Sequence, residues 1–412
     1  MEKFSNHFAF DERSNEEAKI CVVGVGGGGG NAINNMVSQG IQGVEFFAIN
    51  TDKQALKENL ATGKIQAGRE VTKGLGAGAR PNVGEDAVKE SREEIESMIR
   101  GFDMAFITAG MGGGTGTGGA PVVAEIARSL GILTVAIVTK PFEAEGRKRL
   151  AAAEAGIAKL RENVDTLIII SNERLLDIAE DATLIEAFKM ADDVLYNATR
   201  GISDLITVHG LINLDFADVK TTMENGGTAL MGSATASGDN RAERAAHEAI
   251  ESPLLEGVDI AGARNVLVNI TAGRSLGIRE ATRATSIIQR EAGEDVEVIF
   301  GTVIDEAMGE DLRITVIATG FDKADRRNET SVRRTVPLQP EGPAYHYKGE
   351  ENLKNLDVPA YVRRGTPPKE GTGAPERGGK VRRLRMDGLK ERSERILSDG
   401  DEIPMFLKRM MD

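Results

Sequence analysis

Hydrophobic and polar positions along residues 20–171 form two alternating patterns. Short continuous apolar runs predict buried strands at 20–25, 44–49, 104–108, 133–139 and 166–171. Apolar residues at helical spacing predict helices at 31–37, 85–99 and 150–160, and one that opens with Pro121 in its first turn. Strands that alternate with helices are typical of a mainly parallel sheet with helices on both faces.

One long segment of helical periodicity covers residues 183–207. Its apolar residues step by three and four, at Phe188, Ala191, Leu195, Ala198, Ile202 and Leu205. A helix of this length spans about 35–40 Å and is either an ordinary core helix or a strut between two domains. Beyond it, the pattern predicts a helix at 241–251 and strands at 265–270, 296–304 and 314–318. The expected fold is therefore α/β, with a Rossmann-type domain and a second α/β domain.

The periodicity stops at Gly320. Residues 322–398 carry scattered proline, glycine and charged side chains, which predicts a disordered linker. The final residues, 401–412, place an apolar cluster between charges, which fits a short docking peptide as well as it fits a frayed tail. Residues 1–18 are polar and predict a loosely attached extension.

Composition narrows the classes of function. The net charge of −13 argues against general nucleic-acid binding, which requires a basic face. Cys21 is the one cysteine, so an intrachain disulfide is excluded and a buried structural thiol is expected. Nothing resembles a signal peptide or a membrane-spanning run. We therefore expect a cytoplasmic protein that meets membranes only indirectly.

Three glycine-rich loops are present, two directly after predicted strands at 26–30 and 110–119 and one at 74–82 that leads into the helix expected at 85–99. The loop at 110–119 has seven glycines in ten residues between a strand and a helix. Backbone N–H groups approach an oxyanion closely where no Cβ intervenes, and a helix N-terminus favours negative charge. Ligands of such sheets bind at the carboxyl ends of the strands. These loops predict a phosphate cradle rather than plain turns.

The first loop leaves two nucleotide chemistries open. Residues 24–29 satisfy the G-x-G-x-x-G pattern and Asp52 ends the next strand, as in dinucleotide-dependent oxidoreductases. A P-loop is excluded because no Gly-Lys-Ser/Thr follows either loop. One pyrophosphate needs one glycine loop, whereas two loops plus residues 76–78 could surround a triphosphate.

A carboxylate motif at 213–218 is the second chemical feature. Asp215 and Asp218 are three residues apart, and with Asn213 they could orient a water for attack on phosphorus. Equally, an aspartate there could cap the following helix. The motif lies beyond the long helix, at the far end from the glycine loops. If both act on one phosphate, they have to come from two subunits.

Together these motifs resemble the FtsZ family of tubulin-like bacterial cell-division GTPases. The resemblance rests on residues 24–32, the signature 112–118 and the motif 213–218, and it covers 20–320. It implies a self-assembling GTPase that polymerises head to tail into the cytokinetic ring at mid-cell. Residues 401–409 resemble the family's C-terminal peptide, with Met405 where alanine is common. This implies division proteins as partners, such as an FtsA-like membrane tether.

The resemblance also implies a division of the chain and a set of site residues. The segments are an N-terminal extension (1–18), a GTP-binding domain (19–182), a central helix (183–209), a C-terminal α/β domain (210–320), a linker (321–398) and a docking peptide (399–412). The implied contacts to GTP or GDP are Gly27, Gly28, Gly29, Gly30 and Asn31, then Gly114, Thr115 and Gly116, with Glu145 and Arg149 at the ribose and Phe188 and Asp192 at the guanine. The implied hydrolytic residues, inserted into the next subunit's site, are Asp215 and Asp218 beside Asn213.

Mg²⁺ is expected to accompany the phosphates, with no protein ligand assigned to it. Two alternatives to the resemblance are a nicotinamide-dependent oxidoreductase and a scaffold that binds nucleotide without hydrolysing it. The resemblance makes both remote.

Overall fold

The computed structural model describes residues 18–177, 182–208, 210–212, 214–255, 260–293 and 295–321. The expected linker beyond Phe321, the docking peptide, residues 1–17 of the expected extension, and Asn213 lie outside the described residues. No described helix combines the length and the hydrophobicity that crossing a membrane requires.

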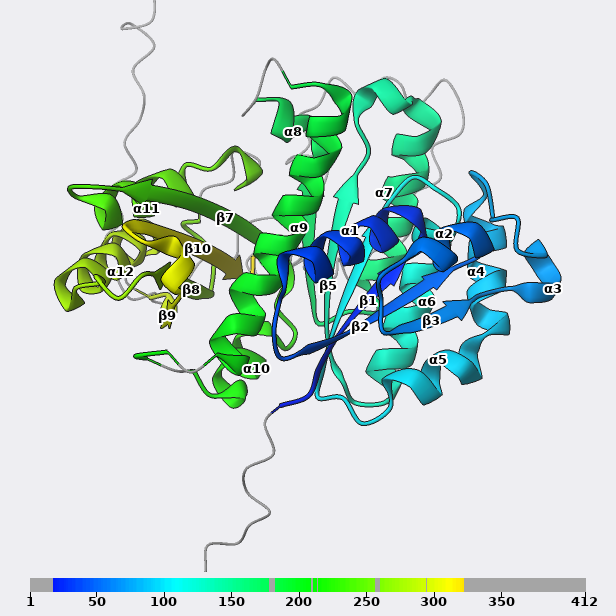
Figure 1. Cartoon of the computed structure of the whole chain (residues 1–412), viewed down its shortest axis with the longest axis horizontal. Coiled ribbons are helices and arrows are strands. Elements are labelled where there is room, and N and C mark those ends of the chain that lie inside the picture. The colour runs from blue at the N-terminus through cyan, green and yellow to red at the C-terminus, as the bar shows by residue number, and fades with distance from the viewer. Residues whose placement is uncertain are drawn as a thin grey trace, which may run out of the picture. The chain divides into compact units, whose positions relative to one another are not determined.

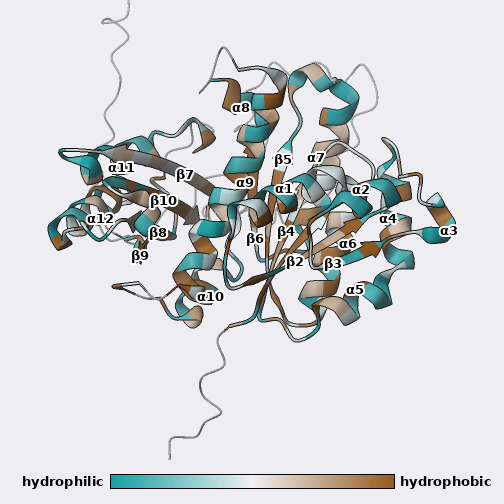
Figure 2. Ribbon diagram, viewed as in Figure 1, coloured by the Kyte–Doolittle hydropathy of each residue, from teal (hydrophilic) through white to brown (hydrophobic). Residues whose placement is uncertain are grey.

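Ten strands of the described chain form one mixed sheet, and the first six of them are parallel (Figure 1). They are β1 (Ile20–Val25), β2 (Val44–Asn50), β3 (Gly63–Gln66), β4 (Met104–Gly110), β5 (Leu133–Lys140) and β6 (Thr166–Ser171). Their order is β3-β2-β1-β4-β5-β6. All six residues of β1 are buried, as expected of a parallel strand with both faces covered. Figure 2 shows the hydrophobic colour of these strands.

Alternate residues of β1 enter two different cores. Ile20 and Val22 join a cluster with α1 (Gly26–Gln39), whereas Cys21 and Val23 join one with the helices of the opposite face. Burial raises the pKa of the Cys21 thiol to about 12, which agrees with its expected structural role. The remaining helices of this part are α2 (Lys53–Glu58), α3 (Arg69–Thr72), α4 (Pro81–Glu90), α5 (Arg92–Ile99), α6 (Thr115–Ser129), α7 (Arg147–Arg161) and α8 (Asn172–Leu176), with the short turn η2 (Glu143–Glu145).

The helix expected at 85–99 is wrong as a single element. It begins four residues earlier, at Pro81, whose fixed φ suits the first helical position. It divides at Ser91, which has a φ of −97° and a ψ of 16° and leaves the helical conformation between α4 and α5. The sequence pattern also missed β3, which is short and has one buried residue, Ile65.

The predicted long helix is confirmed as α9 (Leu184–Thr207), with 24 residues. A capping box fixes its start, because Thr183 Oγ1 accepts from Glu186 N at 3.3 Å and Glu186 Oε2 accepts from Thr183 N at 2.8 Å. Leu195 and Ile202 pack in the same core as α1. On the other side, Asn269 Nδ2 donates to the Gly201 carbonyl at 2.9 Å. α9 therefore joins the six-stranded part to the part that follows.

The C-terminal part continues the sheet in the order β7-β10-β8-β9. β10 is antiparallel to both of its neighbours, while β8 and β9 are parallel, and β7 pairs with β6 over three positions that begin at Thr166 and Gly227. Its elements are α10 (Phe216–Met223), β7 (Gly227–Ser237), α11 (Arg241–Ile250), η3 (Pro253–Leu255), β8 (Asn265–Ala272), α12 (Ile278–Ala292), β9 (Glu297–Ile304), η4 (Glu306–Met308) and β10 (Asp311–Thr319). The expected second α/β layer is thus present, and its strands are of mixed direction.

Candidate functional site

A cavity of 500 Å³ opens beside the carboxyl ends of β1, β2, β4 and β5. The loops after these strands supply most of its wall, and α9 closes one side with Phe188 and Asp192. This is the edge of a doubly wound sheet at which ligands bind. Of the expected contacts, the cavity brings together Gly27, Gly28, Asn31, Gly114, Thr115, Gly116, Glu145, Arg149, Phe188 and Asp192.

The first and second glycine loops approach each other at backbone distance. A Cβ on Gly28 would lie 3.0 Å from the Gly110 backbone, and one on Gly26 would lie 2.7 Å from Gly116 N. Gly26 also has a φ of +75°, which strains any residue with a side chain. Only glycine fits at this contact, so the two loops form one continuous backbone wall.

Two expected contacts are placed differently. Gly29 is buried beneath the wall, where an added Cβ would meet the Thr108 carbonyl oxygen at 2.4 Å. It is therefore placed to let the loop pack onto β4. Gly30 lines a smaller neighbouring cavity of 180 Å³ together with Gly27 and Asn31.

Two helix N-termini start at this wall. α1 begins directly after β1 at Gly26, and α6 begins after Gly114; neither helix start has a side-chain cap. The first N–H groups of a helix have no partner within it, and its dipole places partial positive charge there. Thr115 at the start of α6 has its hydroxyl 2.6 Å from that of Thr51. The wall therefore combines unpaired N–H donors with hydroxyls, which suits phosphate oxygens.

The rim of the cavity carries an ion pair. Arg149 Nη1 lies 2.5 Å from Glu145 Oε2, four residues apart across the start of α7. Glu145 is itself held by the Phe142 backbone N–H, which donates to Oε1 at 3.1 Å. The pair presents one cationic and one anionic group to a ligand's polar edge.

Phe188 and Asp192 lie one helical turn apart on α9, so they share a face. The Phe188 ring is 43% exposed and meets Phe142 edge-to-face, with 5.3 Å between ring centroids. Burial raises the pKa of Asp192 to about 6, and the charge of Asp193 adds to the shift. Asp193 accepts from the neutral amides Asn35 Nδ2 at 3.0 Å and Gln39 Nε2 at 2.9 Å, and it forms no ion pair among the described residues. The site therefore places the exposed aromatic ring of Phe188 beside the carboxyl group of Asp192, whose pKa is raised.

Asn172 is a further lining residue that the sequence analysis did not identify. It follows β6 directly, its side chain is 4% exposed, and its Oδ1 has no hydrogen-bond partner in the described structure. A buried amide oxygen without a partner is costly unless a ligand supplies a donor. The signal that could have found it is its position directly after a predicted strand, as with Asn50, which follows the predicted strand at 44–49.

Asp52, the ribose acid of the oxidoreductase alternative, caps α2. Its Oδ1 accepts from Gln54 N at 2.8 Å and from Ala55 N at 3.4 Å. Asp52 still lines the cavity, so its carboxylate contributes oxygen to the wall near Thr51.

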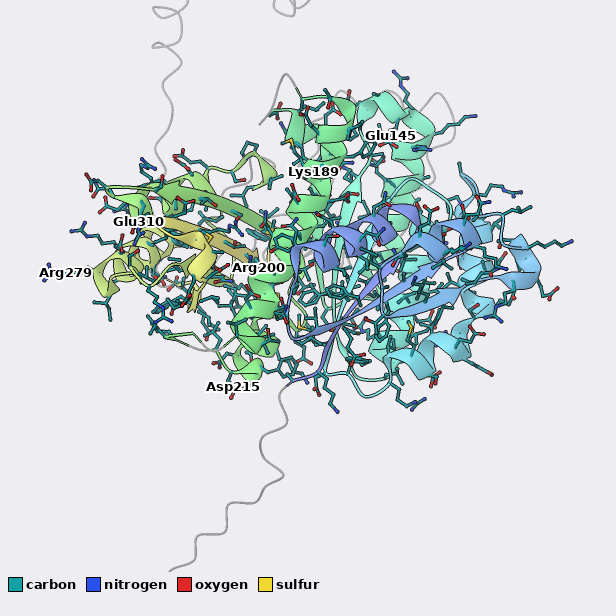
Figure 3. All side chains as sticks on the ribbon, viewed as in Figure 1. Glu145, Lys189, Arg200, Asp215, Arg279 and Glu310 are labelled. Carbon is teal, nitrogen blue, oxygen red and sulfur yellow. The ribbon has the colours of Figure 1, made fainter. Side chains whose placement is uncertain are left out.

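Asp215 and Asp218 are absent from this cavity's lining. Asp215 caps α10 by accepting from Ala217 N at 3.2 Å, and Asp218 lies in the first turn of the same helix. Both are exposed. Figure 3 shows Glu145 near one end of α9 and Asp215 near the other. Beyond Leu195, the last residue of α9 in the cavity lining, the helix continues for about 18 Å to Thr207, and this length separates the carboxylates from the glycine loops.

Comparisons with known proteins agree with this geometry. Residues 19–180 match the GTPase-domain model of the Tubulin/FtsZ family, and residues 227–322 match the C-terminal-domain model of the FtsZ family. An empty FtsZ dimer from M. jannaschii is 45% identical, with a TM-score of 0.73, 76% of this chain covered and 90% of that chain.

Two further solved structures are similar. A point mutant of FtsZ from M. jannaschii is 46% identical, with a TM-score of 0.72 and coverage of 74% of this chain and 92% of that one. A GTPγS-bound protofilament of CetZ2 from Haloferax volcanii is 21% identical, with a TM-score of 0.62 over 76% of this chain and 99% of that chain, and shares the fold. Every loop of the cavity lies within the GTPase-domain match.

Proposed function

Because the chain belongs to the tubulin/FtsZ family and is a GTPase, we propose that it polymerises head to tail and hydrolyses GTP between successive copies. The observation that carries this proposal is the separation of the two halves of the site. The glycine loops face the N-terminal half of α9, which lines the cavity as far as Leu195, whereas α10 follows the C-terminal end of α9 at Thr207, about 18 Å further along the axis. A second copy stacked along this axis would bring its α10 to the first copy's cavity.

Within one copy, the residues divide the nucleotide into three parts. The N-termini of α1 and α6 take the phosphates through backbone N–H groups, with Thr115 adding a hydroxyl. Glu145 and Arg149 take the ribose. Phe188 stacks on the guanine, and Asp192 accepts its ring N–H and amino protons.

The oxygen-only donors beside the phosphate wall, Thr51, Asp52 and Thr115, fit a magnesium ion. When bound, the ion would neutralise charge that develops on the phosphates. The chain's own contribution to hydrolysis comes from Asp215 and Asp218 of the next copy, which orient the attacking water and accept its proton. Asn213 precedes them in the same motif.

The cellular role that we propose is assembly of the cytokinetic ring at the mid-cell division site of a bacterium, in the cytoplasm. Residues 399–412 would bind division proteins such as an FtsA-like membrane tether. The segments 19–182, 183–209 and 210–320 would act as the GTP-binding domain, the connecting helix and the domain that carries the catalytic loop.

Dilution and complementation test the shared site. Turnover per molecule should rise steeply above a threshold concentration, with filaments visible by electron microscopy. Asp218→Ala and Asp192→Ala variants should each be slow, and their mixture should regain activity because some interfaces combine an intact cavity with an intact carboxylate. A flat rate over a wide dilution series, with no recovery on mixing, would remove the proposal.

A further inference from the structure

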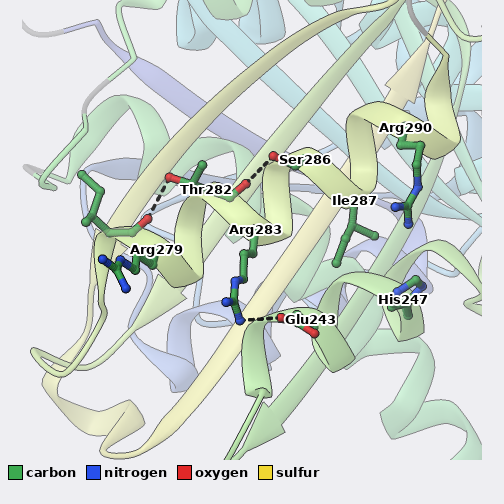
Figure 4. A pocket seen from close by; sticks show the side chains of 9 residues that line it. Glu243, His247, Arg279, Thr282, Arg283, Ser286, Ile287 and Arg290 are labelled. Carbon is green, nitrogen blue, oxygen red and sulfur yellow. Dashed lines mark hydrogen bonds and ion pairs between the residues drawn. The ribbon is translucent and has the colours of Figure 1, made fainter.

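A second cavity, of 570 Å³, lies between α11 and α12, away from the glycine loops (Figure 4). We call it the α11–α12 groove, lined by Glu243 and His247 of α11 and by Ile278, Arg279, Thr282, Arg283, Ser286, Ile287 and Arg290 of α12. The inner faces of both helices, including Ala245 and Ala284, pack into the C-terminal core. The groove is therefore the surface that these helices present away from that core.

Positive charge dominates the groove although the chain carries a net charge of −13. Arg283 pairs with Glu243 at 2.8 Å, and Arg290 pairs with its neighbour Glu291 at 3.4 Å. Arg279 has no ion pair within the described residues. Beside these cations Ile278 is 80% exposed. An occupant should therefore combine carboxylates with apolar side chains.

We propose that the groove binds residues 399–407 of the same chain. This segment reads Asp-Gly-Asp-Glu-Ile-Pro-Met-Phe-Leu, so three carboxylates precede four apolar side chains and a proline. The carboxylates of Asp399, Asp401 and Glu402 complement the three arginines, and Ile403 and its apolar neighbours cover the exposed Ile278. The segment itself lies outside the described residues.

The chain between Phe321 and the segment 399–407 is long enough for the segment to reach the groove and short enough to keep it nearby. Phe321, the last described residue, packs against the same core that α11 and α12 cover, so the chain leaves close to the groove's own layer. About 75 residues separate it from the segment, and a flexible chain of that length has an r.m.s. span of roughly 45–50 Å. Tethering of this kind gives an effective concentration approaching the millimolar range, so a weak site is occupied. A docked segment is withheld from any other protein.

Disulfide trapping tests the docking in the full-length protein. The one native cysteine, Cys21, is buried with 0% exposure, so introduced cysteines supply the reactive thiols. A Gly400→Cys, Ser286→Cys variant should form an intrachain disulfide under mild oxidation with oxidised glutathione. A matched variant with Gly400→Cys and Ser129→Cys, at an exposed serine on α6, should give a several-fold lower yield.

Charge reversal in the tail provides the second arm. The double substitution Asp401→Lys, Glu402→Lys should reduce the disulfide yield at Ser286→Cys to that of the Ser129→Cys control. A salt concentration of about 0.5 M should do the same, because it screens the charges. Both substituted residues lie outside the described part of the chain. GTP turnover confirms that each cysteine variant is folded. Equal yields at the two serines, a yield that ignores charge reversal, or cross-linked dimers in place of monomers would each overturn the proposal.

Discussion

Asp192 stands out at the scale of single residues, because its surroundings oppose the charge that its proposed role needs. Burial raises its pKa from 3.8 to about 6. The folded state therefore binds this proton more tightly than the unfolded state, and the stability that this contributes is present below about pH 4 and lost as the pH rises through 6. At neutral pH the nucleotide-free protein therefore carries a partly desolvated carboxylate at Asp192, and the N–H donors of a guanine would supply its missing hydrogen bonds.

Replacing this carboxylate should separate stability from binding. We expect Asp192→Asn to raise the melting temperature of the nucleotide-free protein at pH 7.5, with the gain fading toward pH 4. GTP affinity should fall roughly 10- to 100-fold, from lost hydrogen bonds to a charged acceptor at about 1.5–3 kcal/mol. Thermal shift and GTP titration measure both. Asp86→Asn, at an exposed site on α4, should change neither, and a variant that loses stability at pH 7.5 would contradict this account.

At this scale the site residues that belong to sequence motifs were predicted, and a site residue that depends only on its place in the fold was missed. Ten of the expected contacts line one cavity, because glycine loops after parallel strands converge at one edge. Asn172 belongs to no motif, and its role depends on the burial of its side chain after β6. The sequence offered Asp52 only as a ribose acid, whereas it caps α2, because capping and ligand contact use the same residue type.

At the scale of elements, close helix contacts explain glycines that do not line the cavity. A Cβ on Gly118 of α6 would lie 1.9 Å from the Pro81 carbonyl oxygen at the start of α4. α4 and α6 therefore pack backbone to backbone, which holds the start of α6 in place.

Gly118→Ala should destabilise the fold, because α4 must move away from α6. Overpacking of this kind costs about 1–3 kcal/mol, or more when backbone must shift. The urea midpoint measures it. Gly113→Ala is the matched control, since its Cβ would meet nothing within 4 Å although Gly113 lines the cavity. Equal midpoints for the two variants would refute the packing explanation.

The carboxylates of α10 make a second prediction at this scale. Asp218 does not cap the helix, so Asp218→Ala should leave folding and GTP binding nearly intact. Turnover should fall about 10²–10⁴-fold, the range that a general base contributes. Loss of GTP binding by the isolated variant would instead place this carboxylate in its own subunit's cavity. Asp215 is less informative, because its removal also costs the cap, about 1 kcal/mol.

The long elements were predictable, whereas short elements such as β3 and the boundaries of elements were not. The runs of β1, β4 and β5 are continuous and apolar, so their burial on both faces was readable from the sequence. The division at Ser91 is a local backbone choice within a continuous helical pattern. The mixed strand directions of the C-terminal part depend on pairings between distant segments, which periodicity does not contain.

Across the whole molecule, Arg200 joins α9 to the C-terminal part. Its guanidinium donates to Asp204 at 2.9 Å, to Asp305 at 2.7 Å and to the Tyr196 hydroxyl at 2.8 Å. Burial raises the pKa of Asp204, and the charge of Arg200 opposes that shift. One side chain thus neutralises carboxylates from two separate segments.

Arg200→Met should remove the paired cation of the buried Asp204 and leave it the weaker attraction of Arg313. Breaking a fully buried pair costs about 3–5 kcal/mol, and the cost here should be lower because Arg200 keeps a quarter of its side chain exposed. Without its partner Asp204 takes up a proton more readily, so the deficit should grow as the pH rises from 5 to 8. Urea unfolding at both pH values measures it. The exposed Arg283→Met should show a small deficit at either pH, and an Arg200→Met deficit that ignores pH would count against this assignment.

The backbone wall of the cavity also limits how the protein can change over generations. Every single-base change of a glycine codon that alters the residue adds a side chain. At Gly114 and Gly116 the new carbon would fall 2.2 and 2.7 Å from carbonyl oxygens. The proposed backbone contacts to the phosphates therefore cannot be altered by stepwise substitution. Phe188, Asp192 and Asn172 act through their side chains, which substitution can alter step by step. We therefore expect substitutions that change nucleotide preference to occur on α9 and directly after β6, while the residues of the glycine loops stay unchanged.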